Sequence, residues 1–453
     1  MKEFPVNQVL RPEQIHLEDF SAISVPVMLK EDHGLRGTTL IYSQEANRRS
    51  VKELKLDHHM INGCQYWFDP MPPPPTTTEV GELGMWSQES REAWLAGAPA
   101  PETDAVFRAV TDWLDSFLVF PSDQRNGNLA TLSSWVMMTY LFRALPAVPY
   151  LYFSGPLGSG KTRAMEVLAR IAFRPMMSSS LTGPTVFRGR HATGCTLLFD
   201  EAERMQEDSP EVAELRAMLL AGYKNGATAR RLEPVGNSYR MVAFQVYGPT
   251  VLACIKGLPP ALASRCITIR MSRAAKGEER VTRSLDDLPD QPQKIIDDLH
   301  CWSLEHGYDA SIQNVDYGSL SNRDAELWSP LLKIAAHSGD HDLVGLIQQH
   351  ASNMVALTID DKSNQADPVF LNALYQLRQA GEFPTPQEVL ELAQELEPGC
   401  FDSYKARGLS NALKNYGITA ARSNGKRIFR TELKEIVEIT GNYGFDLEGK
   451  SNE

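Results

Sequence analysis

One stretch of this chain, residues 149–162, limits its possible folds more than any other; it reads PYLYFSGPLGSGKT. The apolar run at 150–153 predicts a buried strand, and the periodic apolar residues after Lys161 predict a helix. A strand, the pattern GxxxxGK[ST] and a helix, in this order, are typical of a phosphate-binding P-loop. Its glycines let backbone N–H groups point at phosphate oxygens, and the helix N-terminus adds to that field. The sequence therefore predicts an α/β core that binds ATP with Mg²⁺.

Within this loop, the chemistry of each side chain suggests a role. Lys161 would reach the β- and γ-phosphates, and the Thr162 hydroxyl would bind Mg²⁺. We expect the nucleotide to contact Gly155, Pro156, Leu157, Gly158, Ser159, Gly160, Lys161 and Thr162. The alternative interpretation is a glycine turn before an ordinary helix.

A second motif, CTLLFDEAE at 195–203, argues against that alternative. An apolar strand that ends in Asp200 and Glu201 is typical of a Walker B motif, in which Asp200 holds Mg²⁺ and Glu201 polarises the attacking water. Between the two motifs there is room for one helix and one strand, and residues 175–181 are a candidate for that strand. This spacing suits the P-loop ATPases that have an additional strand between the P-loop strand and the Walker B strand. An acidic helix start after any strand would look similar, but the two motifs together predict ATP hydrolysis.

Composition and charge exclude several classes of protein. No apolar run in the 453 residues approaches the roughly 18 residues of a membrane span, and the first residues lack the apolar core of a signal peptide. The six cysteines are scattered without a CxxC pair, which argues against a zinc site or a disulfide framework and favours a cytoplasmic location. Because the net charge is −12, any nucleic-acid surface must be a local basic patch.

The residues before the P-loop carry weaker signals. Residues 21–29 and 37–43 are short β-like runs, and MPPPPTTT at 71–78 predicts an extended linker. Two apolar-periodic stretches, 106–118 and 129–145, predict a helical lead-in to the P-loop domain.

A basic hairpin is predicted after the Walker B motif. Two β-like arms, 227–232 and 239–246, flank a PVGNS turn. The segment carries Lys224, Arg230, Arg231 and Arg240. We interpret it as a loop that grips nucleic acid, and a solvated surface hairpin is the alternative.

The end of the chain predicts a winged helix. Helices at 385–396 and 406–418 are followed by a hairpin with an Asn-Gly turn at 419–430 and by a closing helix. Between residues 403 and 430 there is no acidic residue. The basic residues in this stretch are Lys405, Arg407, Lys414, Arg422, Lys426, Arg427 and Arg430. This local reversal of charge suits phosphate contacts, although winged helices also bind proteins.

Several of these segments together resemble a family of uncharacterised helicase-like P-loop ATPases of phages, plasmids and integrated mobile elements, often encoded beside primase modules. The segments are GSGKTRAMEVLARIAFRP, TLLFDEAE, ELRAMLLAGYKNGATARR, YGPTVLACIKGLPPALASRCITIRM and NRDAELWSPLLKIAA, roughly within 105–336. The resemblance implies an AAA+ fold near the superfamily-3 and minichromosome-maintenance helicases. On this basis residues 1–100 form a small mixed N-terminal region with the Pro-rich linker, 101–275 the AAA+ core with its helical lead-in, 276–380 a helical lid and connector, and 381–453 the winged-helix-like domain.

The resemblance also implies roles for two arginines. In ring ATPases an arginine at the position of Arg265 reaches the neighbouring subunit's γ-phosphate, and Ser264-Arg265-Cys266 matches the arginine-finger triplet of clamp loaders. Arg323, beside the capping residue Asn322 of a predicted helix, would be a lid sensor that folds down on ATP. The alternatives are an ordinary ion pair for Arg265 and a solvent-exposed side chain for Arg323.

One departure from the family pattern concerns the polar sensor near the γ-phosphate. The strand before Pro259 usually ends in a polar residue, often Asn. Here the nearby residues are Cys254, Ile255 and Lys256. The sequence therefore leaves two alternatives open: slow hydrolysis, or a substitute sensor at Lys256 or Thr250.

These features lead to one hypothesis and two alternatives. We expect a homo-oligomeric ring, a hexamer, that hydrolyses ATP and moves on single-stranded and duplex DNA as the replicative helicase of a mobile genetic element. A primase or other replication proteins are candidate partners, and no membrane is expected. The alternatives are an ATP-gated clamp or helicase loader, and the ATPase subunit of a defence system.

Overall fold

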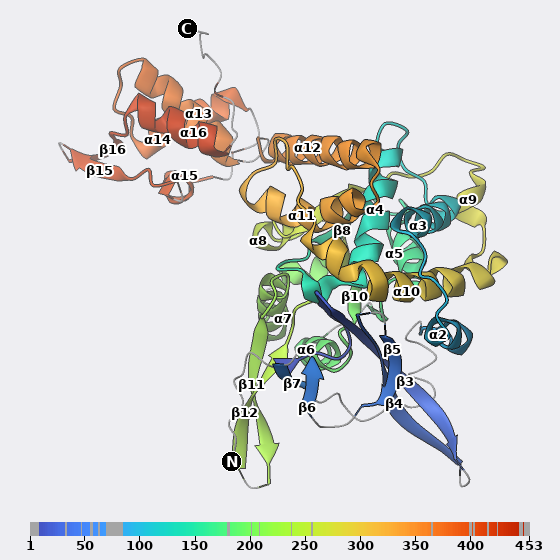
Figure 1. The fold of residues 1–453 in the computed structure, drawn as a ribbon. Helices are drawn as coiled ribbons and strands as arrows, with labels where there is room; N and C mark the ends of the chain where they lie inside the picture. Colours follow the sequence, from blue (N-terminus) through green and yellow to red (C-terminus); the bar gives the residue numbers. More distant parts are fainter. Residues whose placement is uncertain are drawn as a thin grey trace. The chain divides into compact units, whose positions relative to one another are not determined.

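The computed structural model describes most of the chain, which forms two compact units, Met1–Ala351 and Ser352–Glu453 (Figure 1). The described residues are 9–31, 34–46, 48–54, 58–61, 64–68, 85–178, 182–200, 202–207, 209–236, 238–254, 257–363, 366–397, 401, 404–414, 416–423, 425–443 and 447. Glu201, Lys256, Asn424 and the proline run at 71–78 lie outside the described residues.

A five-stranded parallel sheet forms the core of the first unit, in the order β14-β8-β13-β10-β9. Its strands are β8 (Tyr150–Ser154), β9 (Pro175–Ser178), β10 (Thr196–Phe199), β13 (Thr250–Cys254) and β14 (Cys266–Arg270). The predicted second strand is therefore present, and β13 lies between the P-loop strand β8 and the Walker B strand β10, which confirms the predicted additional strand. Because the strands are parallel, the residues after β8 and after β10 meet at the same edge of the sheet.

Helices surround this sheet (Figure 1). They are α3 (Thr103–Phe117), α4 (Arg125–Thr139), α5 (Lys161–Ala169), α6 (Gly183–Thr193), α7 (Pro210–Ala221), α8 (Pro260–Ala263) and α9 (Glu279–Thr282), with short 3-10 turns at Phe142–Ala144, Ala202–Gln206 and Leu285–Asp287. The lead-in helices are tied to the core by buried indoles: Trp113 Nε1 donates to the Val167 carbonyl at 3.1 Å, and Trp135 Nε1 donates to the Pro149 carbonyl at 2.9 Å.

The second lead-in helix is shorter than the prediction of 129–145, because α4 ends at Thr139. Two hydroxyls hold the chain where it leaves the helix. Thr139 Oγ1 accepts from the Phe173 amide at 3.1 Å, and the Tyr140 hydroxyl donates to the Ile171 carbonyl at 2.9 Å. These contacts fix the chain to the segment after α5, and the apolar residues that follow are buried outside the α-helix, first in the 3-10 turn Phe142–Ala144 and then in extended backbone at Leu145.

The residues before the lead-in form β-structure. One antiparallel sheet has the order β2-β3-β4-β5, and a three-stranded sheet has the order β1-β7-β6. The bounds are β1 (Val9–Leu10), β2 (Ile15–Leu17), β3 (Phe20–Glu31), β4 (Gly34–Glu45), β5 (Arg48–Glu53), β6 (His58–Ile61), β7 (Cys64–Phe68) and the helix α2 (Gln88–Leu95). The two predicted β-like runs are thus the arms of one long hairpin, β3–β4. Its residues Val25 and Tyr42 pack against Trp86 and Trp94, which buries one face of the sheet.

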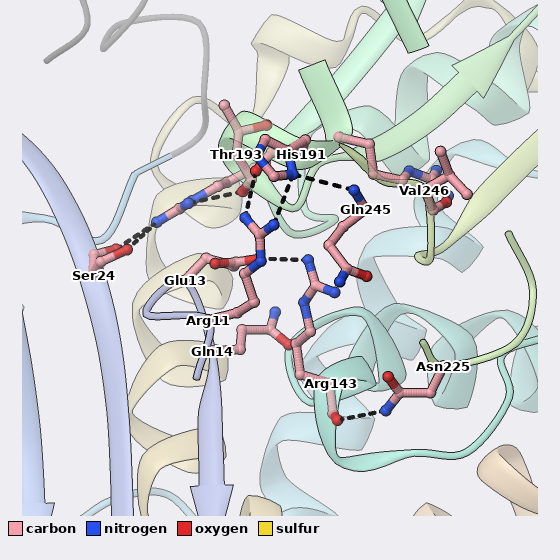
Figure 2. A network of polar contacts seen from close by, with 12 residues as sticks. Arg11, Glu13, Gln14, Ser24, Arg143, His191, Thr193, Asn225, Gln245 and Val246 are labelled. Carbon is pink, nitrogen blue, oxygen red and sulfur yellow. Dashed lines mark hydrogen bonds and ion pairs between the residues drawn. The ribbon is translucent and has the colours of Figure 1, made fainter. Parts of the chain in front are cut away.

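A buried polar network joins this β-structure to the sheet core (Figure 2). The carboxylate of Glu13 pairs with Arg143 at 2.5 Å, and both side chains are almost fully buried. Arg174 donates to the carbonyls of Thr193 and Ser24. Burial alone raises the pKa of the Glu13 carboxyl, but the guanidiniums of Arg143, Arg11 and Arg174 together outweigh burial and hold it below its usual value. The N-terminal β-structure is therefore part of the same folded unit as the sheet core.

The buried pair predicts a large loss of stability when its carboxylate is removed. Glu13→Gln should lower the free energy of unfolding at neutral pH by about 3–5 kcal/mol, because Arg143 would stay buried without its counter-charge. Since the pKa of Glu13 is lowered on folding, its contribution is present above pH 4.5 and is lost as the pH falls further, so the two proteins should converge in acid. Urea denaturation followed by tryptophan fluorescence measures the difference.

The exposed pair of Glu31 with Arg36 supplies a matched control for this measurement. Both side chains are about half exposed, so Glu31→Gln should cost less than about 1 kcal/mol. Equal effects of Glu13→Gln and Glu31→Gln would contradict a stabilising role for the buried pair.

The remaining helices of the first unit are α10 (Asp290–Ile312), α11 (Asn322–His337) and the start of α12 (His341–Ser363). The prediction that Asn322 caps α11 is wrong by one residue. Ser321 is the N-cap, with extended backbone, and Asn322 begins the helix with a φ of +49°. Asparagine tolerates this left-handed conformation better than most residues.

The second unit is a small helical domain with a hairpin. Its elements after α12 are α13 (Ala366–Gln379), α14 (Pro386–Leu396), α15 (Ala406–Lys414), β15 (Ala420–Ser423), β16 (Lys426–Phe429) and α16 (Leu433–Tyr443). Thr385 and Glu388 form a capping box that starts α14. Phe370, Leu409, Phe429 and Ile436 meet in one apolar core. The order helix, helix, hairpin, helix agrees with the prediction, and α13 adds one helix before it.

Candidate active site

The glycine loop has the backbone that a P-loop needs. It follows the carboxyl end of β8 and leads into α5, whose N-cap is Gly160, with a left-handed φ of +88°. At Gly155 a Cβ would lie 2.3 Å from the carbonyl oxygen of Met271, so only glycine fits. The amides at the start of α5 therefore face the same region as the loop, and the helix dipole makes that region favourable for an anion.

The two predicted metal ligands meet at this edge of the sheet. Thr162 Oγ1 donates to Asp200 Oδ2 at 2.8 Å, although β13 separates the strands that precede them. A hydroxyl and a carboxylate are the hard oxygen donors that Mg²⁺ prefers. The buried Ser159 hydroxyl also has no hydrogen-bond partner within the described residues, which fits a loop that accepts phosphate oxygens. Glu201, expected to polarise water, lies outside the described residues.

Lys161 lies inside its own loop. Its Nζ donates to the carbonyl of Gly155 at 2.7 Å and to that of Pro156 at 3.0 Å. The ammonium is thus held within the glycine loop by carbonyls of the loop itself.

The segment after β14 lies against the same loop, which the sequence did not indicate. The Met271 amide donates to the Ser154 carbonyl at 2.7 Å, and Arg273 Nη2 donates to the Leu157 carbonyl at 3.3 Å. Arg273 therefore adds a cation beside the P-loop from the same chain. In the sequence, Arg273 stands at the start of a polar stretch that is typical of a connector. The only signal that could have placed it beside the glycine loop is its position shortly after the core strand β14.

A second group of cations gathers around the ring of Tyr223. The guanidiniums of Arg265 and Arg323 and the ammonium of Lys224 lie 5.1, 5.3 and 5.6 Å from the ring centroid. Arg265 Nε also donates to the Leu220 carbonyl at 2.8 Å, and Lys224 pairs with Glu326 at 2.8 Å. Tyr223 is thus a platform that orients two arginines. The sequence indicated only that Tyr223 ends an apolar-periodic stretch, and not that it has this role.

This platform lies at the other edge of the sheet from the P-loop. The Tyr150 amide, at the amino end of β8, donates to the Arg265 carbonyl at 3.0 Å. The P-loop follows the carboxyl end of the same strand, roughly 16 Å away for a five-residue strand. The structure therefore brings Arg323 to Arg265 and not to the P-loop of its own chain, where a lid sensor was expected.

The hypothesis that Thr250 serves as the polar sensor is wrong. Thr250 begins β13, far from the P-loop edge, and its hydroxyl accepts from Arg190 at 3.0 Å. Cys254 ends the strand beside Ser154, and its thiol donates to the Tyr152 hydroxyl at 3.4 Å. Lys256, the other substitute, lies outside the described residues.

The basic hairpin forms as predicted, from β11 (Thr228–Val235) and β12 (Ser238–Gln245). Its predicted contact residues differ in their surroundings. Arg230 and Arg240 are exposed, while Arg231 forms an ion pair with Glu214. Lys224 lies at the base of the hairpin and is paired with Glu326.

The seven basic residues predicted between 403 and 430 lie on or beside α15 and the β15–β16 hairpin. All seven of them are exposed. Arg422 and Arg427 are direct cross-strand partners, and like charges in this arrangement repel unless an anion lies between them.

Comparisons with known proteins add little to this geometry. The sequence matches no protein family and no curated protein. The structure is similar to the crystal structure of a full-length MCM homolog from Methanopyrus kandleri, with 9% sequence identity and a TM-score of 0.34, over 74% of this chain and 76% of that chain. A likeness at this level carries no weight for function, which rests on the contacts described above. Among the described residues, no helix is long and apolar enough to span a membrane.

Proposed function

We propose that this protein is an AAA+ ATPase that forms a homo-oligomeric ring and acts on DNA, as the replicative helicase of a mobile genetic element. The observation that carries the proposal is the hydrogen bond between Thr162 and Asp200, which joins the P-loop to the Walker B strand across β13. Thr162 and Asp200 would hold Mg²⁺, which neutralises phosphate charge when it is bound. Lys161 would bind the β- and γ-phosphates, and Glu201 would polarise the attacking water.

The Tyr223 platform supports a ring. Arg265 and Arg323 lie at the opposite edge of the sheet from their own P-loop. Two guanidiniums held on one ring are suited to a polyphosphate, and in a ring the neighbouring subunit presents one. We therefore assign both arginines to the neighbour's nucleotide, where a guanidinium stabilises the charge of the transition state.

The second unit supports an action on DNA. From α14 on, its elements follow the order that we predicted for a winged helix. The seven exposed basic residues between 403 and 430 lie on or beside α15 and the β15–β16 hairpin, the surfaces that such a domain would offer to a groove and its flanking phosphates. In a chain of net charge −12 this concentration of positive charge favours a polyanionic partner.

One experiment separates the proposal from its alternatives. ATPase rates are measured with and without single-stranded and forked DNA, together with strand separation. A helicase should be stimulated by single strands and should separate forks. Hydrolysis without strand separation would favour a loader or a defence ATPase, and no hydrolysis at all would contradict the proposal.

The wing predicts a specific salt dependence of duplex binding. Replacing Arg422, Lys426 and Arg427 together with alanine should flatten the slope of log affinity against log salt by up to about 3 units, because each phosphate contact contributes about 0.9. The loss should be similar on all duplex sequences, and ATPase activity without DNA should not change. Fluorescence anisotropy over a salt series measures the slope.

A charge-matched variant controls for the change in net charge. Lys30, Lys52 and Lys434 are exposed, and replacing them with alanine removes the same three charges from other surfaces. An equal loss in both triple variants would mean that general charge, and not the wing, sets the affinity.

A further inference from the structure

The segment that follows β14 starts beside the glycine loop and continues along α5, the helix that begins at that loop. Its start is fixed to the end of the P-loop strand. Arg270, the last residue of β14, pairs with Ser154, the last residue of β8, and the Met271 amide donates to the Ser154 carbonyl at 2.7 Å. Arg273 therefore stands two residues beyond a point that is hydrogen-bonded to the strand from which the glycine loop begins.

The later part of the segment is held by α5 itself. Arg163, in the first turn of α5, donates to the Arg283 carbonyl. Arg170, the C-cap of the same helix, pairs with Asp286 at 2.9 Å. Because both ends of the segment are attached to elements that flank the glycine loop, the residues between them keep their place relative to that loop.

The guanidinium of Arg273 lies against the loop with most of its donors unused. Among the described residues it has no carboxylate partner, and its one hydrogen bond is long, from Nη2 to the Leu157 carbonyl at 3.3 Å. A Cβ at Gly158 would lie 3.1 Å from the same Nη2, so the glycine leaves room for the guanidinium. Arginine has five N–H donors in a planar fork, which suits it to bind an anion bidentately.

The order of the strands indicates which end of a bound nucleotide Arg273 would meet. β14 and β10 lie on opposite sides of the P-loop strand β8. The pair of Thr162 and Asp200, which would hold Mg²⁺, lies on the β10 side, and Mg²⁺ bridges the β- and γ-phosphates. The γ-phosphate would therefore point towards β10, and the α-phosphate and the nucleoside towards β14, where Arg273 lies.

Charge distinguishes the groups at that end of the nucleotide. Mg²⁺ and Lys161 both act on the β- and γ-phosphates, so neither compensates the charge of the α-phosphate. The ribose and the base are uncharged, and a guanidinium without a carboxylate partner gains more from a phosphate than from either of them.

We propose that Arg273 binds the α-phosphate of the nucleotide held by the P-loop of its own chain. The inference rests on the proposed function and adds a binding residue that lies outside both nucleotide motifs of the sequence. The charge of the α-phosphate is the same before and during transfer of the γ-phosphate. The contact therefore stabilises the bound substrate and the transition state equally, which lowers KM and leaves kcat unchanged.

Kinetics of the full-length protein test this division. Arg273→Ala should raise the KM for ATP about ten-fold or more, as expected for the loss of a hydrogen bond to a charged group, with kcat near the wild-type value. Arg273→Lys keeps the charge but not the fork, so its KM should lie between the two. Arg283→Ala is the matched control, because it removes an exposed arginine from the same segment, and its KM should not change. Phosphate release over a range of ATP concentrations measures both constants.

A series of ligands locates the contact on the nucleotide. A non-hydrolysable ATP analogue, ADP and inorganic tripolyphosphate each compete with a fluorescent ADP analogue, in the presence of Mg²⁺. Arg273→Ala should weaken all three by a similar factor, since each of them places a phosphate at the α position. Without nucleotide, the midpoint of thermal unfolding of Arg273→Ala should equal that of the wild type, because the side chain is exposed.

Five results would overturn the inference. An unchanged affinity for all three ligands would remove Arg273 from the site. A loss for the ATP analogue but not for ADP would place the contact at the γ-phosphate, and a loss for both nucleotides but not for tripolyphosphate would place it on the nucleoside. An equal loss in Arg283→Ala would indicate general charge, and a lowered unfolding midpoint would indicate a role in the fold. The proposed motor fails separately, if the wild type binds all three ligands through Arg273 but hydrolyses no ATP.

Discussion

Replacing Lys161 with alanine should abolish ATP binding and hydrolysis by the full-length protein. Lys161 Nζ is held within the glycine loop by two of its carbonyls, at the place where the β- and γ-phosphates would bind. Without the ammonium, the loop itself carries no positively charged side chain for a highly charged ligand. We expect the turnover of ATP to fall at least about 10²–10³-fold. Binding of a fluorescent ATP analogue and release of phosphate measure the two effects separately.

Two variants make this result interpretable. Lys276→Ala removes an exposed lysine from the segment after β14 and should leave turnover near the wild-type value. Lys161→Arg keeps the charge but not the compact ammonium, so it should stay far below the wild type. Normal hydrolysis by Lys161→Ala would mean that the loop from 155 to 162 is not the nucleotide site.

Replacing Arg265 with alanine should leave ATP binding almost intact while turnover collapses. The guanidinium lies on the Tyr223 ring, at the opposite edge of the sheet from its own P-loop, so it has a phosphate to bind only on a neighbouring subunit. Arginines that act in this way contribute about 10³–10⁵ to the rate. Because Arg323 shares the platform, Arg323→Ala should lower turnover in the same manner, and Arg108→Ala, at an exposed position of α3, should not.

Mixing experiments show whether the arginine acts between subunits. Glu201→Gln should bind ATP without hydrolysing it. Mixing Arg265→Ala with Glu201→Gln should restore part of the activity, since some interfaces then combine an intact arginine with an intact glutamate. The absence of rescue at every mixing ratio would place the action of Arg265 within its own chain.

The sequence predicts, for a physical reason, that the glycine loop and Asp200 meet at one edge of the sheet. The residues that form it are close in the chain to the strands that position them, so Lys161, Thr162 and Asp200 follow from two local patterns. Parallel pairing then brings the patterns together, as the contact of Thr162 with Asp200 shows. The starts of helices can be predicted for the same reason. The capping box that starts α14, for example, depends only on Thr385 and Glu388, which are three residues apart.

The position of Arg323 could not be predicted in the same way. A helical pattern at 322–339 shows which residues share a face, but not which edge of a distant sheet that face meets. The structure settles this through Tyr223, which comes from the end of α7 and holds an arginine from before β14 beside one from α11. Because these three residues are far apart in the chain, no periodic pattern in the sequence indicates that they are in contact.

The surroundings of the basic hairpin could be predicted only in part. Alternation along a strand already separates Arg230 from its neighbour Arg231, since adjacent side chains point to opposite faces. What the sequence does not show is which face is covered. That depends on Glu214 and Phe187, which lie on two helices elsewhere in the chain.

The proline run at 71–78 looks like the natural place to shorten this chain, but the fold argues against cutting there. A fragment that starts after it loses Glu13 and Ser24, the partners of two buried guanidiniums at Arg143 and Arg174. It also uncovers the indoles of Trp86 and Trp94, which pack on the lost strands. Although the sequence of the run is typical of a linker, the polypeptide on its two sides folds together, and a minimal folded fragment has to keep the residues that precede it.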